Sequence, residues 1–534
     1  MSTDQPARKR LASLDQFRGY TVAGMFLVNF LGSFAACPTV LRHHHSYCSY
    51  ADTIMPGFLF AVGFAFRLTF GRRAAEQGLS SAYFRVVRRF LGLVLFSIIF
   101  YGAGKPEETW QALTELSLMD ILYKPMKREW YQTLMHIAVT ALWITPVIRA
   151  GTKIRVLWMV GSAILHVFLS YQFNFIWCNS SPNAIDGGPL AFLTWSVPAI
   201  LGTLACDAII GSSGRPPLLK MLLWSVLVMA LGWGMSFGSK LYEMTPEEVE
   251  QLQVEKAEQA EERAAIGEEL KKLVEDLNAQ RSERKKIVDS IETFKKKRLA
   301  EAVATLQSER GLTGFPSTAL IDEAEESLKQ APIDDAELLE LENELIVFDS
   351  QNTIEELKPQ IKELKQKFDS FVDLKLATDP VIPSAERIER MKQRIADEGW
   401  GAIVANPPFV KPPEDDKRIT FEPYRQHFRW NYWMMCQRAG TLSYLTFAGG
   451  LNLALYVIFY VFNDVIGLKF GVFRTFGVNA LAGYIAHEMV GRAVKPFIPK
   501  DALDWYMWSG FAVFFLLTYM FIRHLEKHNI FLRL

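Results

Sequence analysis

Long apolar runs recur along most of the chain, and they restrict its fold more than any other feature. A helix needs about 20 apolar residues to cross a hydrocarbon core of about 30 Å. Helices are favoured there because every backbone N–H and C=O must find a partner within the segment. The sequence therefore predicts an all-α, polytopic membrane protein of about ten spans, centred on residues 20–36, 53–70, 87–104, 131–148, 155–171, 191–211, 217–238, 441–463, 470–491 and 505–523.

Basic residues in the short loops set the expected orientation. Lysine and arginine collect on the cytoplasmic side of membrane proteins. The segment before the first span and the loops after the second, fourth and sixth spans are rich in them. We therefore expect a multi-pass protein of the cell (inner) membrane, with both termini cytoplasmic and no cleaved signal peptide. One predicted outer loop opposes this orientation, since it contains Lys105, Lys124, Lys127 and Arg128.

A charged segment interrupts the apolar runs and is dense in Glu, Lys, Gln and Asp. Apolar residues at heptad-like spacing predict an antiparallel coiled-coil hairpin, broken near Gly311 and Pro316. Pro359 should kink or delay the second arm. The hairpin follows a seventh span, so it should lie outside and serve as a spacer, an oligomer contact or a contact for a protein partner. The predicted parts are a membrane part at 1–240, an extracytoplasmic coiled-coil insertion with a proline-rich linker at 241–430, and a second membrane part at 431–534.

The sequence argues against a DNA methyltransferase and against a structural metal site. The run Asn406-Pro407-Pro408-Phe409 matches a motif of base-flipping methyltransferases, but no glycine-rich turn for a cofactor surrounds it. We interpret it as an extended proline linker and expect no nucleic-acid partner. The cysteine and histidine spacings do not predict a metal site. A Cys37–Cys48 bridge around the histidine loop and free thiols are both compatible with the sequence.

Three consecutive histidines follow the first apolar run. His43, His44 and His45 lie in the loop that leaves it, and Asp52 opens the next run. Imidazole has a pKa of about 6.5, so it can accept a proton near neutral pH, or it can carry an acyl group covalently. We expect one of the three to act in this way, with Asp52 as its partner or as a helix cap. A plain solvent loop or an adventitious metal binder is the alternative.

Further polar residues fall within the spans. Asn29 and Asn479 lie inside predicted spans, where polar groups are costly and tend to be functional. They are predicted to bind a donor substrate or to position the histidine, with helix-to-helix hydrogen bonding as the alternative. His487 lies at the outer end of the ninth span, where it either assists the site or lies at the interface as an amphipathic side chain.

Charged residues mark the predicted cytoplasmic mouth of the first span. Asp15 and Arg18 lie there, and Arg67, Arg72 and Arg73 lie in the next cytoplasmic region. Arginines recognise phosphate groups well, so this group is predicted to bind a phosphorylated donor. Membrane orientation alone would place the same arginines there.

The motifs together resemble the heparan-α-glucosaminide N-acetyltransferase family of membrane acyltransferases. The resemblance is carried by Ser13–Gly19, Val28-Asn29, the histidine loop with Asp52–Gly63, Gln132–His136, Asp186-Gly187-Gly188, Pro198–Thr203, Thr441–Gly449 and Phe476–Glu488. It covers nearly all of the predicted spans and none of the insertion. Where the family has a tryptophan after its histidine, this chain has Tyr47, and the spacing differs.

The resemblance implies transfer of an acetyl group from cytoplasmic acetyl-CoA to an amino sugar or other amine or hydroxyl outside the membrane. The functional histidine would be the one in the first outer loop. Two alternatives come from other classes: a transporter or flippase, and a non-catalytic membrane anchor for the coiled coil. A transporter of common type would show two related halves with broken helices, and the sequence has no such repeat.

Overall fold

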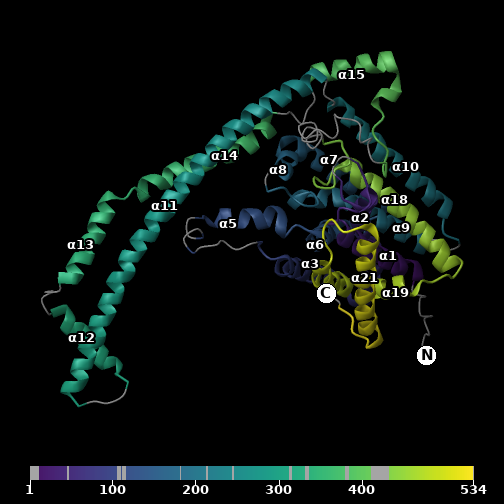
Figure 1. Ribbon diagram of the computed structural model, residues 1–534. Coiled ribbons are helices and arrows are strands. Elements are labelled where there is room, and N and C mark those ends of the chain that lie inside the picture. The colour runs from purple at the N-terminus through teal and green to yellow at the C-terminus, as the bar shows by residue number, and fades with distance from the viewer. Residues whose placement is uncertain are drawn as a thin grey trace. The chain divides into compact units, whose positions relative to one another are not determined.

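The computed structural model describes residues 11–44, 47–104, 110, 113, 116–180, 182–211, 215–242, 246–311, 315–330, 336–378, 384–410 and 432–532 (Figure 1). Every regular element in these ranges is helical. The chain divides into two compact units. The first comprises Met1–Leu252 with Lys375–Leu534, and the second comprises Gln253–Leu374.

Apolar helices build the first unit. Six segments are long and apolar enough to cross a membrane, as expected of a multi-pass membrane protein: Tyr50–Gln77, Thr152–Asn179, Gly188–Ile210, Leu218–Tyr242, Leu442–Val465 and Asp504–Lys527. The helices are α1 (Ala12–Leu31), α2 (Tyr50–Gln77), α3 (Leu79–Tyr101), α5 (Leu118–Lys124), α6 (Thr133–Ile144), α7 (Thr152–Leu169), α8 (Phe175–Asn179), α9 (Phe192–Ile210), α10 (Leu218–Ser236), α15 (Ala385–Glu398), α18 (Leu442–Tyr460), α19 (Gly471–Val478), α20 (Ala480–Val494) and α21 (Asp504–Lys527).

Several boundaries differ from those expected. Helix α1 begins at Ala12 and ends at Leu31, whereas the first span was expected at 20–36, because the polar residues at its start are part of the helix. The span expected at 155–171 continues to Asn179 through a π-helical turn. The span expected at 470–491 is two helices, broken at Asn479, whose φ of −125° and ψ of 48° are not helical. These differences concern helix ends, where the apolar pattern carries least information.

Contacts among the helices define two ends of the first unit. At one end, which we call the arginine end, Arg67 of α2 and Arg155 of α7 both bind Asp207 of α9. At the other, the histidine end, the start of α2 meets the start of α18, because the Tyr444 hydroxyl donates to the Asp52 carbonyl. The first turns of α2, α9 and α18 therefore lie at the histidine end, and α1 runs towards it.

Close helix packing relies on small residues. A Cβ atom at Gly63 of α2 would collide with the backbone of Ala199 in α9, and one at Gly202 of α9 would collide with the backbone of Phe60. Small residues let helix backbones approach each other within a membrane. This contact fixes α2 beside α9, and with it the relative positions of the turns that precede both helices.

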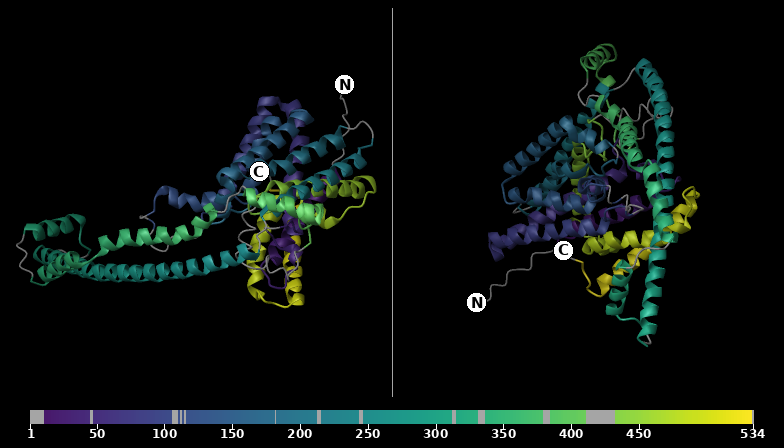
Figure 2. Two further views of the ribbon diagram at one scale, coloured as in Figure 1. Left: turned by 90° about the horizontal axis from the view of Figure 1, so that it is seen from above. Right: turned by 90° about the vertical axis from the view of Figure 1, so that its left-hand side faces the viewer.

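The second unit is a helical hairpin. Its long arm is formed by α11 (Pro246–Glu309) from Gln253 onward, and the returning arm consists of α12 (Thr318–Gln330), α13 (Ala336–Gln351) and α14 (Ile354–Thr378) up to Leu374. Figure 2 shows the two arms running side by side. Three small apolar clusters join them in antiparallel order: Leu277 with Ile354 and Leu357, Ile287 and Ile291 with Leu338, and Val303 with Leu320 and Ala324. Pro359 lies inside α14, which begins at Ile354, so it does not delay this arm.

Candidate functional site

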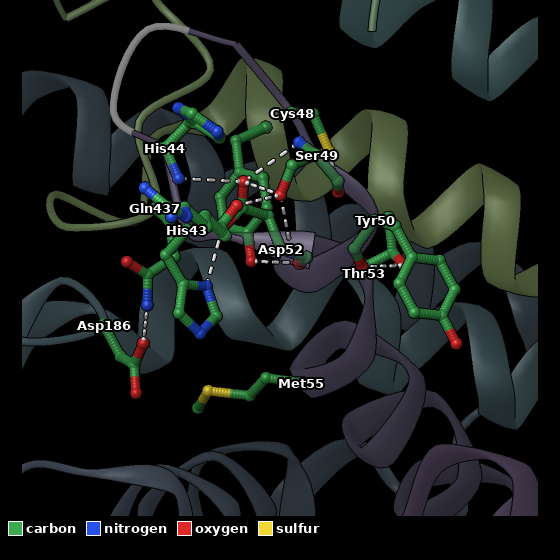
Figure 3. A network of polar contacts seen from close by, with 12 residues as sticks. His43, His44, Cys48, Ser49, Tyr50, Asp52, Thr53, Met55, Asp186 and Gln437 are labelled. Atoms are coloured by element: carbon green, nitrogen blue, oxygen red, sulfur yellow. Dashed lines mark hydrogen bonds and ion pairs between the residues drawn. The ribbon is translucent and has the colours of Figure 1, made fainter. Parts of the chain in front are cut away.

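Asp52 organises the loop at the histidine end. Ser49 is the N-cap of α2, and Asp52 is the third residue of the helix, so the two form a capping box. The Asp52 carboxylate is 1% exposed and accepts hydrogen bonds from the Ser49 N–H (3.0 Å) and from the His43 Nδ1 (2.8 Å). The carboxylate that caps the helix is therefore the one that binds His43 (Figure 3).

The structure distinguishes the histidines of the run. The His43 side chain is 45% exposed, and its second ring nitrogen points away from Asp52, towards Asp186 and Met55 (Figure 3). The His44 ring instead contacts the Thr39 carbonyl at 2.9 Å and packs on Tyr47, with ring centroids 4.4 Å apart. His45 lies outside the described residues. His43 is thus the histidine of the described pair that is both held by a carboxylate and accessible.

A second carboxylate, Asp186, lies beside His43. It precedes two glycines, and all three residues have positive φ: 53° at Asp186, 88° at Gly187 and 62° at Gly188. A left-handed turn of this kind is unusual for a residue with a side chain. The indole N–H of Trp195 donates to the Asp186 carbonyl at 2.8 Å, and the amide of Gln437 donates to its carboxylate. These bonds hold the strained residue in place.

Sequence reasoning did not select Asp186 or Gln437 as site residues. The available signal was the Asp-Gly-Gly turn itself, which was used only for the family resemblance. The turn packs closely against Gly440, and the Gly187 N–H donates to the Arg438 carbonyl at 2.8 Å. The loop at 432–441 thereby brings Gln437 to Asp186.

The surroundings shift the protonation of both groups. Burial lowers the pKa of His43, but the hydrogen bond and charge of Asp52 and the charge of Asp186 outweigh it, so the pKa of His43 is raised overall. Burial raises the pKa of Asp186 to about 6, although His43 and Gln437 act in the opposite direction. A carboxyl whose pKa is raised to about 6, beside an imidazole whose pKa is also raised, is suited to proton transfer.

The start of α2 is completed by residues from far along the chain. Pro56 has no N–H, so the Asp52 carbonyl lacks the donor that an uninterrupted helix would provide. The buried hydroxyl of Tyr444 donates to that carbonyl at 2.6 Å. On the other side, the Phe409 N–H donates to the Cys48 carbonyl at 2.8 Å. The run expected to be only a proline linker is therefore anchored to the histidine loop at Phe409, whose φ is 68°.

The remaining predicted residues fall into separate groups. Asn29 and His487 lie together, with the Asn29 amide 3.4 Å from the His487 Nε2, and Phe26 stacks on the imidazole. Asn479 lies elsewhere, since its side chain binds the backbone of Ile530 and Leu532 near the end of the chain. The structure thus pairs Asn29 with His487, whereas the Asn479 amide binds the C-terminal segment.

At the arginine end lie the basic residues that were predicted to bind a phosphorylated donor, and the structure gives Arg67 different partners from the rest. Arg67 binds Asp207 at 2.8 Å and also binds the Ile148 carbonyl, so its guanidinium is engaged by protein groups. The charges of Arg73 and Arg18 both act on Arg89, which places guanidinium groups from α1, α2 and α3 near one another. Asp15 lies one turn before Arg18 in α1, and its backbone packs against Gly477 of α19.

The cysteines and the possible metal ligands complete the description. All five cysteines are buried and free, so Cys37 and Cys48 are not bridged. Within the described ranges, no group of three or more His, Cys, Asp or Glu side chains could hold a metal ion.

Comparisons with known proteins do not extend this description. No known protein family matches the chain. No curated protein matches its sequence significantly.

Proposed function

We propose that this chain is a transmembrane acyltransferase that passes an acetyl group from cytoplasmic acetyl-CoA to an amine or hydroxyl acceptor, such as an amino sugar, on the other side. The geometry of His43 carries the proposal. Asp52 accepts a hydrogen bond from Nδ1, which fixes the neutral tautomer and leaves the lone pair on Nε2. That nitrogen points away from Asp52, towards Asp186 and Met55, on a side chain that is 45% exposed.

The chemistry follows from this tautomer. Nε2 of His43 takes the proton of the acceptor N–H or O–H as the acceptor attacks the acetyl carbonyl and the C–S bond breaks. In a second route, Nε2 itself attacks the carbonyl carbon and carries the acetyl group before the acceptor arrives. In both routes the Asp52 carboxylate stabilises the positive charge that develops on the ring. Asp186 provides a protonatable carboxyl beside the same nitrogen.

The charge distribution supports a donor at the arginine end. Arg18, Arg73 and Arg89 are like charges brought close together, and such an arrangement favours an anionic ligand. The phosphates of acetyl-CoA are anions of the required kind. A polyanion cannot cross lipid, so the acetyl group would travel to His43 while the phosphates remain at the arginine end.

The proposed topology has about ten crossings, with α1, α3, α6 and α19–α20 joining the six long apolar segments. The arginine end is cytoplasmic in this proposal, and the coiled-coil insertion lies outside.

One predicted outer loop contains basic residues, which the charge rule would place on the cytoplasmic side. Two of these residues make contacts within the protein. Lys127 is buried and bonds to Ser180 at 2.8 Å, and Arg128 donates to the Asn183 carbonyl at 3.0 Å. Tertiary contacts therefore engage these two charges in an outer loop.

The test is transfer of labelled acetyl from acetyl-CoA by the purified protein in nanodiscs, supplied with a panel of amino sugars. We expect turnover in the wild type and its loss in His43→Ala, whereas His528→Ala, an exposed histidine of the C-terminal region, should retain it. A label trapped on the protein without acceptor would favour the acyl-histidine route. If the folded wild type neither binds acetyl-CoA nor transfers acetyl, the proposal fails and transport becomes the leading function.

A further inference from the structure

A row of buried polar side chains follows one face of α7 and α8 and has no role in the site described above. Each member is at most 3% exposed. The members, which we call the α7 polar row, are Arg155, Ser162, His166, Ser170, Asn174 and Cys178. Polar groups inside a membrane-spanning segment are costly unless they have partners or a function.

The local helix geometry keeps the row aligned. Side chains four residues apart drift around an α-helix, because a turn contains about 3.6 residues. The segment Ser170–Asn174 is a π-helical turn, which holds about one more residue per turn and reverses this drift. Asn174 and Cys178 therefore stay on the face that carries His166. Single π turns of this kind occur frequently at functional sites.

Three polar atoms in the row have no hydrogen-bond partner among the described residues. They are Nε of Arg155, Nε2 of His166 and Nδ2 of Asn174, all on buried side chains. The other ring nitrogen of His166, Nδ1, is 2.9 Å from the Tyr432 hydroxyl and 3.5 Å from the Ser170 hydroxyl. Buried polar atoms without a protein partner are usually satisfied by internal water. From Ser162 to Cys178 the members follow one another every four residues, about one helical turn or 5.4 Å, a separation that one water molecule can bridge. The step from Arg155 to Ser162 is about two turns and requires a longer water bridge.

The ends of the row meet the two ends of the first unit. Arg155 binds Asp207 and the Thr203 hydroxyl at the arginine end, where the Asp207 side chain is 34% exposed. At the histidine end, the Cys178 thiol donates to the Gly187 carbonyl at 3.2 Å. Gly187 follows Asp186, whose charge acts on His43. The row thus extends from an accessible carboxylate to the neighbourhood of the candidate base.

We propose that the α7 polar row holds a chain of water molecules that conducts protons between the Asp186–His43 site and the arginine end. The role of this proton conduction rests on the proposed acetyl transfer. In the acyl-histidine route, the C–S bond breaks when Nε2 of His43 takes the acetyl group, and coenzyme A leaves towards the arginine end as its thiolate. The acceptor then attacks the acetyl carbon, the bond to Nε2 breaks, and the proton of the acceptor N–H or O–H stays on His43. Conduction along the row returns that proton to the thiolate, so each turnover moves no net charge across the membrane. His166 can relay it by accepting a proton on one ring nitrogen and releasing one from the other.

Proton flux into liposomes tests the inference directly. The purified full-length protein is reconstituted with a pH-sensitive dye inside, and valinomycin with a potassium gradient imposes a membrane potential; no acetyl-CoA is added. We expect flux above that of protein-free liposomes in the wild type, and loss of this excess in His166→Phe. Thr518→Val is the matched control, because it removes a buried hydroxyl of α21 that donates to the Phe514 carbonyl of the same helix. It should conduct as the wild type does.

Each outcome is decisive. Wild-type flux no greater than that of empty liposomes overturns the inference, and so does wild-type flux in a folded His166→Phe variant. If that variant does not fold, Asn174→Leu replaces it, with gel filtration as the check on folding. Since the assay contains no acetyl-CoA, proton flux without acetyl transfer would overturn only the proposed function. Acetyl transfer without proton flux would overturn only the conduction.

Discussion

At the scale of single residues, Asp52 determines the form in which His43 is present. The charge and hydrogen bond of Asp52 raise the pKa of His43 against the opposing effect of burial. The neutral ring is the reactive form, so acetyl transfer should increase as the pH rises through this pKa. Asp52→Asn removes the charge, so the acidic limb of the pH–rate profile should move to lower pH and the maximal rate should fall. Initial rates across pH measure both effects, and an unchanged acidic limb would exclude His43 as the titrating base.

Asp186 should make the stability of the protein depend on pH. Burial raises its pKa from 3.8 to about 6. The folded state therefore binds a proton that the unfolded state has lost, and stability falls as the pH rises from about 4 to about 6. The total change is up to about 3 kcal/mol. Asp186→Asn cannot titrate and should lack this decrease, as thermal unfolding in detergent between these pH values would measure. A parallel loss of stability in the variant would contradict this assignment.

Much of the His43 site was predictable, because its core is local in sequence. The capping box of Ser49 and Asp52 is a short pattern that a sequence displays directly, and the histidines lie in the loop just before it. Asp186 and Gln437 could not be placed beside them in the same way. Asp186 reaches His43 because α2 packs on α9 through Gly63 and Gly202, and Gln437 reaches Asp186 because Gly440 packs on Gly187; both contacts join segments far apart in the chain. The bulk of the fold was predictable for the simpler reason that apolar length determines membrane helices.

At the scale of elements, the first turn of α2 depends on a group outside the helix. Pro56 leaves the Asp52 carbonyl without a helical donor, and the Tyr444 hydroxyl replaces that donor. Tyr444→Phe should cost about 1–3 kcal/mol, because a buried carbonyl is left unpaired. In the Pro56→Ala background the new backbone N–H can pair with the carbonyl, so the same substitution should cost less. Unfolding of the four proteins of this cycle measures the coupling, and equal costs in both backgrounds would show that the proline is not responsible.

At the scale of the whole molecule, the two ends of the first unit should face opposite sides of the membrane. Glu76, at the end of α2, is exposed at the arginine end. Asp501 is exposed next to Lys500, whose carbonyl accepts the Ala35 N–H at 2.7 Å at the histidine end. A membrane-impermeant thiol reagent added to intact cells should label Asp501→Cys but not Glu76→Cys, whereas lysed cells should allow both. The native cysteines are buried and serve as an unlabelled background. Labelling of both positions from outside would refute this arrangement.

The hydrogen bond between Tyr444 and Asp52 also has a consequence for biosynthesis. The histidine loop leaves the ribosome early, but its neighbours Phe409, Gln437 and Tyr444 are synthesised only after the whole coiled-coil hairpin. Chains fold progressively from the N-terminus as they are made, so this loop stays incomplete through most of translation. A premature stop before Tyr444 would yield a membrane-inserted protein that carries every histidine of the site yet lacks the groups that shape it. Such a product would be a natural substrate for membrane quality control.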